Sequence, residues 1–424
     1  MSSVALAQPA KKRASLGTQL SLRPTGCSGK GKPIRVCFIS PLGYGLYRPE
    51  SGHAFGGAEV QFFLLACALS SDQEFEVSVL TTVETQPGTE RYGSLEVIKR
   101  QGLGRLAGHR EGTCWNEVKA LRGYLSAFLD MQALLRTIGA DVYLHAGAGV
   151  EVGAYALICR LLRRRFIYVV ASSVDLTHPN GKVKGPLRWL YSVGLRLADA
   201  VICRSSEQQA WLLDRYGLQG VLIRTGHPIP TPLVRARGCE DTSSILWVGR
   251  IHPLKQPEMF LDLAERVPKE HFVMIVMPDD VQEALWRRIQ QRGVRLSNVT
   301  VYERIPWNEV STHLGRAKLL VNTSTYEGFP NTFVQAALHG IPILSWAVDP
   351  DSVLSREGIG ICARGSFDSL VASTRQMCAS PDLQGQVGKR AQDYARRYHD
   401  LNHSAEELKT LVRRLAKSPG DVEG

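Results

Sequence analysis

Short apolar runs alternate with amphipathic helical segments along the chain from Pro33 onward. In the first half these runs have the length of strands and read IRVCFIS, FEVSVLTT, ADVYLHA, FIYVVAS and DAVICRS. Their nearly continuous apolarity is typical of strands in a parallel sheet that helices cover on both faces. The pattern therefore predicts a doubly wound α/β domain in this half.

A second series of the same kind follows a polar, turn-rich segment, TPLVRARGCEDTSS, at residues 231–244. Its strand-like runs are ILWVGR, FVMIVMP, NVTVYERI, KLLVNTS and IPILSW. We therefore expect two Rossmann-like domains, at 33–235 and 236–404, between a disordered basic tail at 1–32 and a C-terminal helix and tail at 405–424. Ligands of such sheets bind at the carboxyl ends of the strands, so two facing domains would enclose a central cleft.

Charge and cysteine content narrow the range of partners. The formal net charge is +11, but residues 1–32 hold six basic residues and no acidic one, which leaves +5 for the rest. No nucleic acid partner is expected, whereas polyanionic small molecules or an anionic membrane surface would fit this balance. The nine cysteines are dispersed without a C-x-x-C pair, which favours reduced core thiols in a cytoplasmic protein and indicates no zinc site. The longest apolar runs are too short, or too interrupted by arginine, to span a bilayer.

The first candidate site is the segment GGAEV, which follows the first predicted strand and a long loop. Gly56 and Gly57 carry no side chains that would block a ligand. A helix starting near Ala58 would offer free backbone N–H groups to an anion or a sugar hydroxyl. A flexible loop leading into a helix would also explain these residues, so both interpretations stay open.

The second candidate is the segment VGRIHPLKQPEMF. Arg250 ends a predicted strand and Lys255 lies just before the next helix, so both side chains could reach one point above the edge of the sheet. A planar guanidinium fork and an ammonium point charge together suit a diphosphate. The alternative is a basic loop that only faces solvent.

The third candidate is the stretch TSTYEGFPNTFVQAALHGIP, Thr323 to Pro342. Glu327 follows a strand-like run and could accept hydrogen bonds from sugar hydroxyls. Backbone N–H groups near Gly328 and from Asn331 to Phe333 could hold phosphate oxygens. Thr332 and Gln335 also form the T-x-x-Q pattern of a capping box, so Gln335 could cap the helix instead of meeting a ligand.

These segments, in this order, resemble the retaining nucleotide-sugar transferases of glycosyltransferase family 4, which have the GT-B fold. The resemblance rests on GGAE, VGRIHPLK and STYEGFPNTFVQAALHGIPIL, and it extends from about Pro33 to about Ser404. It implies a nucleoside diphosphate sugar as donor substrate, no cofactor and no metal, and front-face attack by an acceptor hydroxyl. It also implies catalytic roles for Glu327, Arg250 and Lys255.

The resemblance further implies that a common set of residues binds the donor. Position 335 would meet the ribose, yet the E-x7-E pair of the family reads Glu327 and Gln335 here. An amide still donates to and accepts from a hydroxyl, so donor binding is expected to survive this change. The implied donor-binding residues are Gly56, Gly57, Gly328, Phe329, Asn331, Thr332 and Gln335. The expected setting is polysaccharide or glycoconjugate assembly, with a glycan or lipid-linked acceptor.

The first half departs from the family at the position where a histidine often follows the strand FIYVVAS. Here the sequence has Ser172, Ser173 and Asp175, while His178 lies nearby and His145 follows another strand. His145 and His178 are therefore candidates for the acceptor or sugar side. Each could equally be a structural histidine.

Three further patterns suggest other classes of protein. Gly147, Gly149 and Gly153 form G-x-G-x-x-x-G after an apolar strand, and Asp175 follows downstream, which outlines the dinucleotide turn of an NAD(P)-dependent oxidoreductase. Asp349–Asp351 reads D-P-D, which imitates the metal-binding D-x-D of another transferase fold. The substitution at Gln335 would also suit a relative that binds a nucleotide sugar without catalysis.

A basic apolar stripe suggests peripheral contact with an anionic membrane. The segment KGPLRWLYSVGLRLAD spaces its apolar residues as on one helical face, with basic residues on either side, and CRLLRRRF adds four arginines. Packing of the stripe into the core would be the alternative. The residues concerned are Leu187, Leu190, Tyr191 and Gly194, flanked by Lys184, Arg188 and Arg196, with Arg160, Arg163, Arg164 and Arg165.

Overall fold

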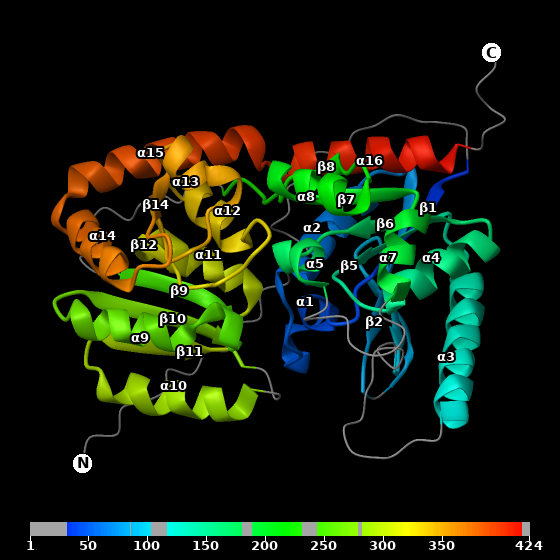
Figure 1. The fold of residues 1–424 in the computed structure, drawn as a ribbon, viewed down its shortest axis with the longest axis horizontal. Helices are drawn as coiled ribbons and strands as arrows, with labels where there is room; N and C mark the ends of the chain where they lie inside the picture. The colour runs from blue at the N-terminus through cyan, green and yellow to red at the C-terminus, as the bar shows by residue number, and fades with distance from the viewer. Residues whose placement is uncertain are drawn as a thin grey trace. The chain divides into compact units, whose positions relative to one another are not determined.

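The computed structural model describes residues 32–84, 86–102, 117–179, 189–230, 244–278 and 282–417. The chain forms two compact units (Figure 1). The first unit contains residues 21–224 together with 402–424, and the second contains residues 225–401. The basic tail expected at 1–32 lies almost wholly outside the described residues.

The first unit contains an eight-stranded sheet in its described part, with the order β3-β4-β2-β1-β5-β6-β7-β8. Every pairing is parallel except the β3–β4 hairpin. The strands are β1 Ile34–Ile39, β2 Phe75–Thr82, β3 Gly88–Tyr92, β4 Leu95–Arg100, β5 Val142–Ala146, β6 Arg165–Val169, β7 Ala200–Cys203 and β8 Val221–Leu222. The helices are α1 Tyr44–Tyr47, α2 Gly57–Ser70, α3 Glu117–Ile138, α4 Glu151–Leu161, α5 Ser173–Thr177, α7 Trp189–Leu197, α8 Ser206–Tyr216 and α16 Leu401–Ala416.

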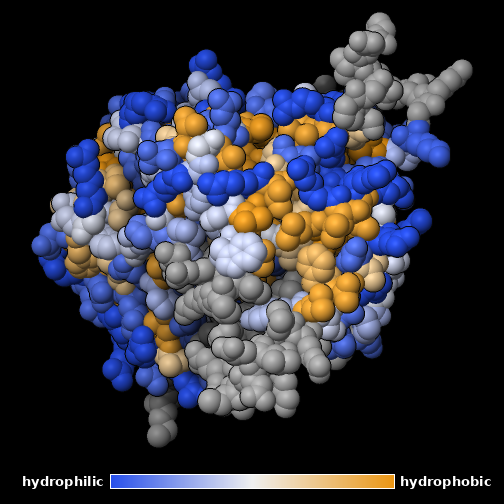
Figure 2. Space-filling view, turned by 45° about the vertical axis from the view of Figure 1, so that its right-hand side comes forward, coloured by the Kyte–Doolittle hydropathy of each residue, from blue (hydrophilic) through white to orange (hydrophobic). Residues whose placement is uncertain are grey.

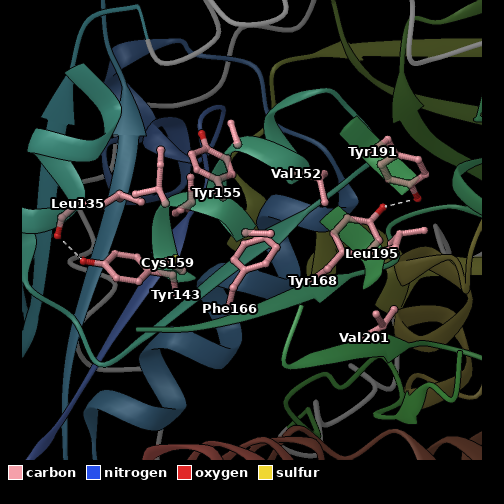
Figure 3. Close-up of a cluster of buried hydrophobic side chains, with 14 of the residues drawn as sticks. Leu135, Tyr143, Val152, Tyr155, Cys159, Phe166, Tyr168, Tyr191, Leu195 and Val201 are labelled. Carbon is pink, nitrogen blue, oxygen red and sulfur yellow. Dashed lines mark hydrogen bonds between the residues drawn. The ribbon is translucent and has the colours of Figure 1, made fainter. Parts of the chain in front are cut away.

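One face of this sheet packs on α3, α4 and α7 through a tyrosine-rich core (Figure 3). Buried hydroxyls need hydrogen-bond partners, and three of the tyrosines here have them. Tyr143 Oη donates to the Leu135 carbonyl oxygen at 2.5 Å. Tyr168 Oη and Tyr191 Oη lie 3.1 Å apart, and Tyr191 also donates to the Asp175 carbonyl oxygen at 3.0 Å. These bonds fix the positions of rings that would otherwise be held by packing alone.

The C-terminal helix α16 belongs to the first unit, although the sequence suggested a separate terminal segment after residue 404. Lys409 Nζ lies 3.0 Å from Asp72 Oδ2, and Arg413 forms a two-pronged contact with the Glu74 carboxylate. These ion pairs attach α16 to the turn before β2. The chain thus enters the second unit at Thr225, somewhat before the predicted boundary, and leaves it after Leu401.

The second unit contains a six-stranded parallel sheet with the order β11-β10-β9-β12-β13-β14. Its strands are β9 Ser244–Arg250, β10 His271–Met277, β11 Val299–Glu303, β12 Ala317–Asn322, β13 Ile343–Ser345 and β14 Gly360–Cys362. Its helices are α9 Pro257–Arg266, α10 Glu283–Arg295, α11 Trp307–Arg316, α12 Asn331–Leu338, α13 Val353–Arg356, α14 Phe367–Ala379 and α15 Pro381–Tyr398, with short 3₁₀ turns η3 Pro253–Lys255 and η5 Pro350–Ser352.

Alternate residues of β9 enter different cores, as the twofold period of a strand requires. Ile245 and Trp247 pack with α9, α10 and α14 on one face, whereas Leu246 packs with α11, α12, α13 and α15 on the other. The predicted α/β class and the doubly wound arrangement are therefore confirmed for both halves of the chain.

Six of the dispersed cysteines lie in the described part of the chain, and four of them are core thiols, as the sequence suggested. Cys37, Cys67, Cys159 and Cys203 are buried free thiols, and burial raises the pKa of Cys37 to about 12. Such thiols are packing residues rather than nucleophiles. Among the helices that the structure describes, none is both long enough and apolar enough to pass through a bilayer.

Candidate active site

Two loops of the second unit meet because their strands are neighbours. β9 leads into η3, and β12 leads into the segment before α12. Since β9 and β12 are paired in parallel, their carboxyl ends lie at the same edge of the sheet. Lys255 and Glu327 form an ion pair across this edge, and Ser324 Oγ donates to Glu327 Oε1 at 2.8 Å. Only 15% of the Glu327 side chain is exposed, so its charge depends on these partners.

A hydrogen-bond network holds the two loops together beneath this ion pair. Thr323 Oγ1 donates to the Lys255 carbonyl oxygen at 2.6 Å and accepts from Trp247 Nε1 at 3.0 Å. Thr325 N donates to the Leu254 carbonyl oxygen at 2.8 Å. The loop that carries Lys255 and the loop that carries Glu327 are therefore one connected structure.

The helix after Glu327 begins earlier than the sequence suggested. α12 starts at Asn331, with Pro330 as its N-cap, and no side chain caps this end. The capping box predicted at Thr332 and Gln335 is therefore wrong, because Thr332 already lies inside the first turn. Pro330 is the N-cap residue, with an extended ψ of 129°, and its carbonyl oxygen accepts from Phe333 N at 3.0 Å, which closes the first turn before Thr332 could cap it. An N-terminus without a side-chain cap keeps its capacity to bind an anion.

The other residues predicted for the donor site differ in how far they are buried and in what they contact. Gln335 and Thr332 are half-buried on α12, and Arg250 ends β9 beside Met277 of β10. Phe329 instead packs its ring 4.5 Å from the His399 ring and is buried. Its contribution to a ligand site would have to come from its backbone, next to Gly328.

His227 is a residue of this site that the sequence did not suggest. Its Nε2 lies 2.9 Å from Asn331 Oδ1, at the start of α12, and its ring stacks on Trp307. Its backbone N donates to the His399 carbonyl oxygen at 2.9 Å. His227 therefore fixes the first residue of α12 from a segment that is 104 positions away in the sequence.

In the first unit, the glycine pair introduces α2, as predicted. The helix begins at Gly57, one residue before the expected start, and Gly56 is its N-cap. The Gly56 N–H is not available to a ligand in this arrangement, because it donates to Glu59 Oε2 at 2.9 Å. A ligand at this terminus would use the following N–H groups.

The two candidate histidines lie on neighbouring parts of the first unit: His145 is within β5, and His178 is the C-cap of α5, which follows the adjacent strand β6. His145 is buried, with Nδ1 3.3 Å from the Ile39 carbonyl oxygen and Nε2 3.9 Å from Glu151 Oε1. His178 is exposed at the end of α5, with Nδ1 3.1 Å from Thr177 Oγ1. Only His178 offers its ring to the surface.

The glycine pattern of the oxidoreductase alternative has a structural explanation. A Cβ on Gly153 would lie 2.3 Å from the Leu190 carbonyl oxygen, and a Cβ on Gly194 would lie 2.7 Å from Gly153 N. These glycines allow α4 and α7 to touch backbone to backbone. Asp175 is also occupied, because its carboxylate accepts from the N–H groups of Ala171 and Ser172 at 3.0 Å.

The D-P-D segment forms a turn. Asp349 Oδ1 accepts from Leu354 N at 2.8 Å, and Asp351 has a left-handed φ of 54°. Among the described residues, no three His, Cys, Asp or Glu side chains are placed to hold a metal ion.

The predicted membrane stripe is wrong as a surface feature. Tyr191 and Gly194 are buried against α4 in the first core. Arg164 pairs with Asp141 at 2.6 Å, and Arg165 pairs with Asp199 at 2.9 Å, so half of the arginine cluster serves internal ion pairs. Leu187, Lys184 and Arg188 lie outside the described residues.

Comparison with known families agrees with this geometry. Residues 55–228 match the family described as Glycosyltransferase Family 4, and residues 242–380 match the one described as Glycosyl transferases group 1. The two matches together cover most of the chain, and the chain belongs to this class of glycosyltransferases. The resemblance inferred from the motifs is confirmed, and the chain is a transferase rather than an oxidoreductase. A comparison with curated protein sequences finds no match.

Solved structures of low sequence identity share the fold. Sucrose-phosphate synthase from Thermosynechococcus elongatus has a TM-score of 0.71 at 18% identity, covering 90% of this chain and 99% of its own. Anabaena HepE in complex with UDP has a TM-score of 0.64 at 16% identity, covering 90% and 100%. A glycosyltransferase from Rickettsia africae has a TM-score of 0.64 at 11% identity, covering 92% and 100%. The predicted GT-B fold is confirmed.

We expect His227 to make the stability of the protein depend on pH. Burial lowers the pKa of His227 to about 4 from 6.5, despite its bond to Asn331. The unfolded chain therefore binds one more proton than the folded chain between these two pH values. The stability that neutral His227 provides is complete above about pH 6.5 and falls by roughly 3 kcal/mol in total as the pH drops toward 4.

Denaturant unfolding of the parent and His227→Gln, followed by tryptophan fluorescence from pH 8 to pH 4, would measure this effect. At pH 8 the comparison isolates the loss of packing, because no titration contributes there. The slope below pH 6.5 should be shallower in the variant. Equal slopes in the two proteins would contradict the assignment.

Proposed function

We propose that this protein transfers a sugar from a nucleoside diphosphate sugar to an acceptor hydroxyl, with retention at the anomeric carbon. The observation that carries the proposal is the Lys255–Glu327 ion pair, held at one sheet edge just before the N-terminus of α12. An ammonium group, a carboxylate and a helix N-terminus without a side-chain cap together suit a diphosphate attached to a polyol. HepE of Anabaena, which shares the fold, has been solved with UDP and with UDP-glucose.

The residues would divide the chemistry between them. Arg250, Lys255 and the first N–H groups of α12 would stabilise the charge that develops on the leaving diphosphate. Glu327 would hold the hydroxyls of the donor sugar. In front-face attack the bond from the anomeric carbon to the phosphate oxygen breaks, and the bond to the acceptor oxygen forms on the same face. The acceptor proton passes to the leaving phosphate oxygen, so no further base is needed.

The setting of the reaction is part of the proposal. We infer a glycan or lipid-linked acceptor in polysaccharide or glycoconjugate assembly at the cytoplasmic side of a membrane. The group 1 and family 4 matches support glycosyl transfer in general, and the exposed surface described below supports the membrane side.

Removing the cations should weaken donor binding and transfer. Lys255→Met and Arg250→Met should each slow transfer by about a hundredfold, since one such electrostatic donor contributes about 3 kcal/mol in the transition state. Lys269→Met, on an exposed turn of the same unit, is the matched control. A thermal-shift panel of UDP, GDP, ADP and TDP sugars would first identify the donor, and calorimetry would then measure its affinity. Parent-like turnover in both folded variants would refute the diphosphate assignment.

Restoring the family carboxylate tests the role of position 335. Gln335→Glu should keep or raise donor affinity by a few fold, because a carboxylate accepts two hydroxyl bonds more strongly than an amide does. Since Gln335 does not form the predicted capping box, an effect on stability alone would not be expected. Calorimetric titration of both proteins with the identified donor decides this. A change in melting temperature with unchanged affinity would count against ribose contact.

We also propose peripheral binding to an anionic membrane, through exposed residues of α3, α4 and α7 that overlap the predicted segments only in part. Leu125 and Leu129 lie one turn apart on α3, Leu161 ends α4 and Trp189 begins α7, and each is more than half exposed. Figure 2 shows apolar surface gathered on the side of the first unit that carries these helices, with hydrophilic residues around it. Arg136 and Arg160 are exposed on α3 and α4, and cations near an apolar surface favour anionic lipid.

Co-sedimentation with vesicles of phosphatidylglycerol and phosphatidylcholine tests this surface. The parent should sediment with anionic vesicles and be released by salt. The double variant Leu125→Asn, Leu129→Asn should bind at least several-fold more weakly. Leu213→Asn, an equally exposed leucine on α8, is the control and should bind like the parent. Equal recovery of the parent in the supernatant with and without anionic lipid would refute the proposal.

A further inference from the structure

Arg204 is a buried cation at the carboxyl end of β7 in the first unit. Only 6% of the residue is exposed. It follows the last residue of the strand and precedes Ser205, the N-cap of α8. β7 lies between β6 and β8 in a parallel stretch of the sheet, and the carboxyl ends of such strands are where α/β domains bind ligands.

The guanidinium of Arg204 has little to bind within the protein. Its Nη1 donates to the Ile223 carbonyl oxygen at 3.2 Å, and its backbone N donates to Gln208 Oε1 at 2.7 Å. In the part of the chain that the structure describes, no carboxylate forms an ion pair with it. One neutral carbonyl satisfies a single donor of a group that has five N–H donors and a full positive charge.

Lys409, another buried cation among the described residues of this unit, does have counter-charges. Lys409 is 4% exposed, and its Nζ lies 3.0 Å from Asp72 Oδ2 and 2.7 Å from Glu406 Oε1. A buried charge without a counter-charge is costly, and pairing offsets that cost. Burial lowers the pKa of Arg204 to about 10, so the group still carries its proton at neutral pH. The counter-charge that Lys409 has is therefore missing at Arg204.

A second buried donor lies within one helical turn. Gln208 is fully buried on α8, and its Oε1 is used by the Arg204 N–H. Its Nε2 has no hydrogen-bond partner. The amide cannot be turned over to satisfy Nε2, because two donors would then face each other at Arg204 N. The residue with the buried cation and the residue with the unmatched amide N–H are thus in direct contact through the Arg204 backbone N and Gln208 Oε1, at the N-terminal, positive end of the eleven-residue helix α8.

We propose that Arg204 anchors an anion site in the first unit, and that it binds a phosphate or carboxylate group of the sugar acceptor. The inference rests on the proposed function, because it assigns the acceptor to an anionic class. A guanidinium matches either group through two parallel N–H bonds. The site is separate from the donor residues, which all belong to the second unit apart from Gly56 and Gly57.

The proposal makes an unusual prediction about stability. Arg204→Met should raise the melting temperature of the protein without ligand, because an apolar side chain removes an unpaired buried charge. If Arg204 had only the structural task of holding Ile223, the same change would lower the melting temperature. Lys409→Met is the matched control and should lower it, since Asp72 and Glu406 would lose their cation.

Inorganic phosphate is the first probe, with sodium chloride at equal ionic strength as the reference. Phosphate should stabilise the parent and Lys409→Met. Arg204→Met should bind phosphate at the first-unit site about tenfold or more weakly, and Arg204→Lys should be intermediate. Measuring each change also in a Lys255→Met background removes the contribution of the donor site. Equal phosphate stabilisation of the parent and Arg204→Met in that background would overturn the proposal.

Glucose 6-phosphate, glucuronate and glucose distinguish the two sources of the anion. Stabilisation of the parent by the phosphate ester alone would identify a phosphate, and stabilisation by glucuronate alone would identify a carboxylate. Equal effects of all three sugars would overturn the assignment to an anionic acceptor. Affinity for the donor should be unchanged in Arg204→Met. Failure of the parent to bind any nucleotide sugar would instead count against the proposed function, while the phosphate titration would still test Arg204.

Discussion

The half-buried carboxylate of Glu327 is the constraint on which the second unit depends. Its charge needs a cation, and that cation is Lys255, which is 72 positions away in the sequence. Only the parallel pairing of β9 with β12 brings the two loops to one edge, and the Trp247–Thr323–Lys255 network then keeps them there. The geometry in front of α12 is therefore a consequence of strand order, and an error in that order would leave a carboxylate unpaired.

The first residue of the same helix is held by a neutral group. His227 bonds to Asn331 while its ring stacks on Trp307, and burial lowers its pKa, which keeps it uncharged at neutral pH. A charged group here would bring its own counter-ion to the N-terminus of α12. A neutral histidine fixes the helix and leaves the positive end of its dipole for a ligand. An uncharged His227 and a charged Lys255 would therefore both favour an anionic ligand at the N-terminus of α12.

Much of this arrangement was predictable from the sequence, and the failures have physical causes. The parallel strands were recognisable because burial on both faces requires continuous apolar runs. The antiparallel β3 was missed, because GTERY alternates and carries charge. The motifs located Lys255, Glu327 and α12, but Pro330 moved the helix start and removed the predicted capping box. His227 could not be found, because a lone histidine in a turn gives no sign of a partner 104 positions away.

The two units differ in which of their buried or partly buried charged side chains have a partner of opposite charge. At the edge of the second unit where β9 and β12 end, Lys255 and Glu327 neutralise each other, so an anionic ligand would have to exchange with an existing pair. In the first unit, α4 and α7 touch backbone to backbone through Gly153 and Gly194. The incompletely matched donors described above lie elsewhere in this unit, on Arg204 after β7 and on Gln208 of α8. The motifs therefore predict candidate residues in the second unit, whereas candidate residues in the first unit must be inferred from the charges that the fold leaves unbalanced.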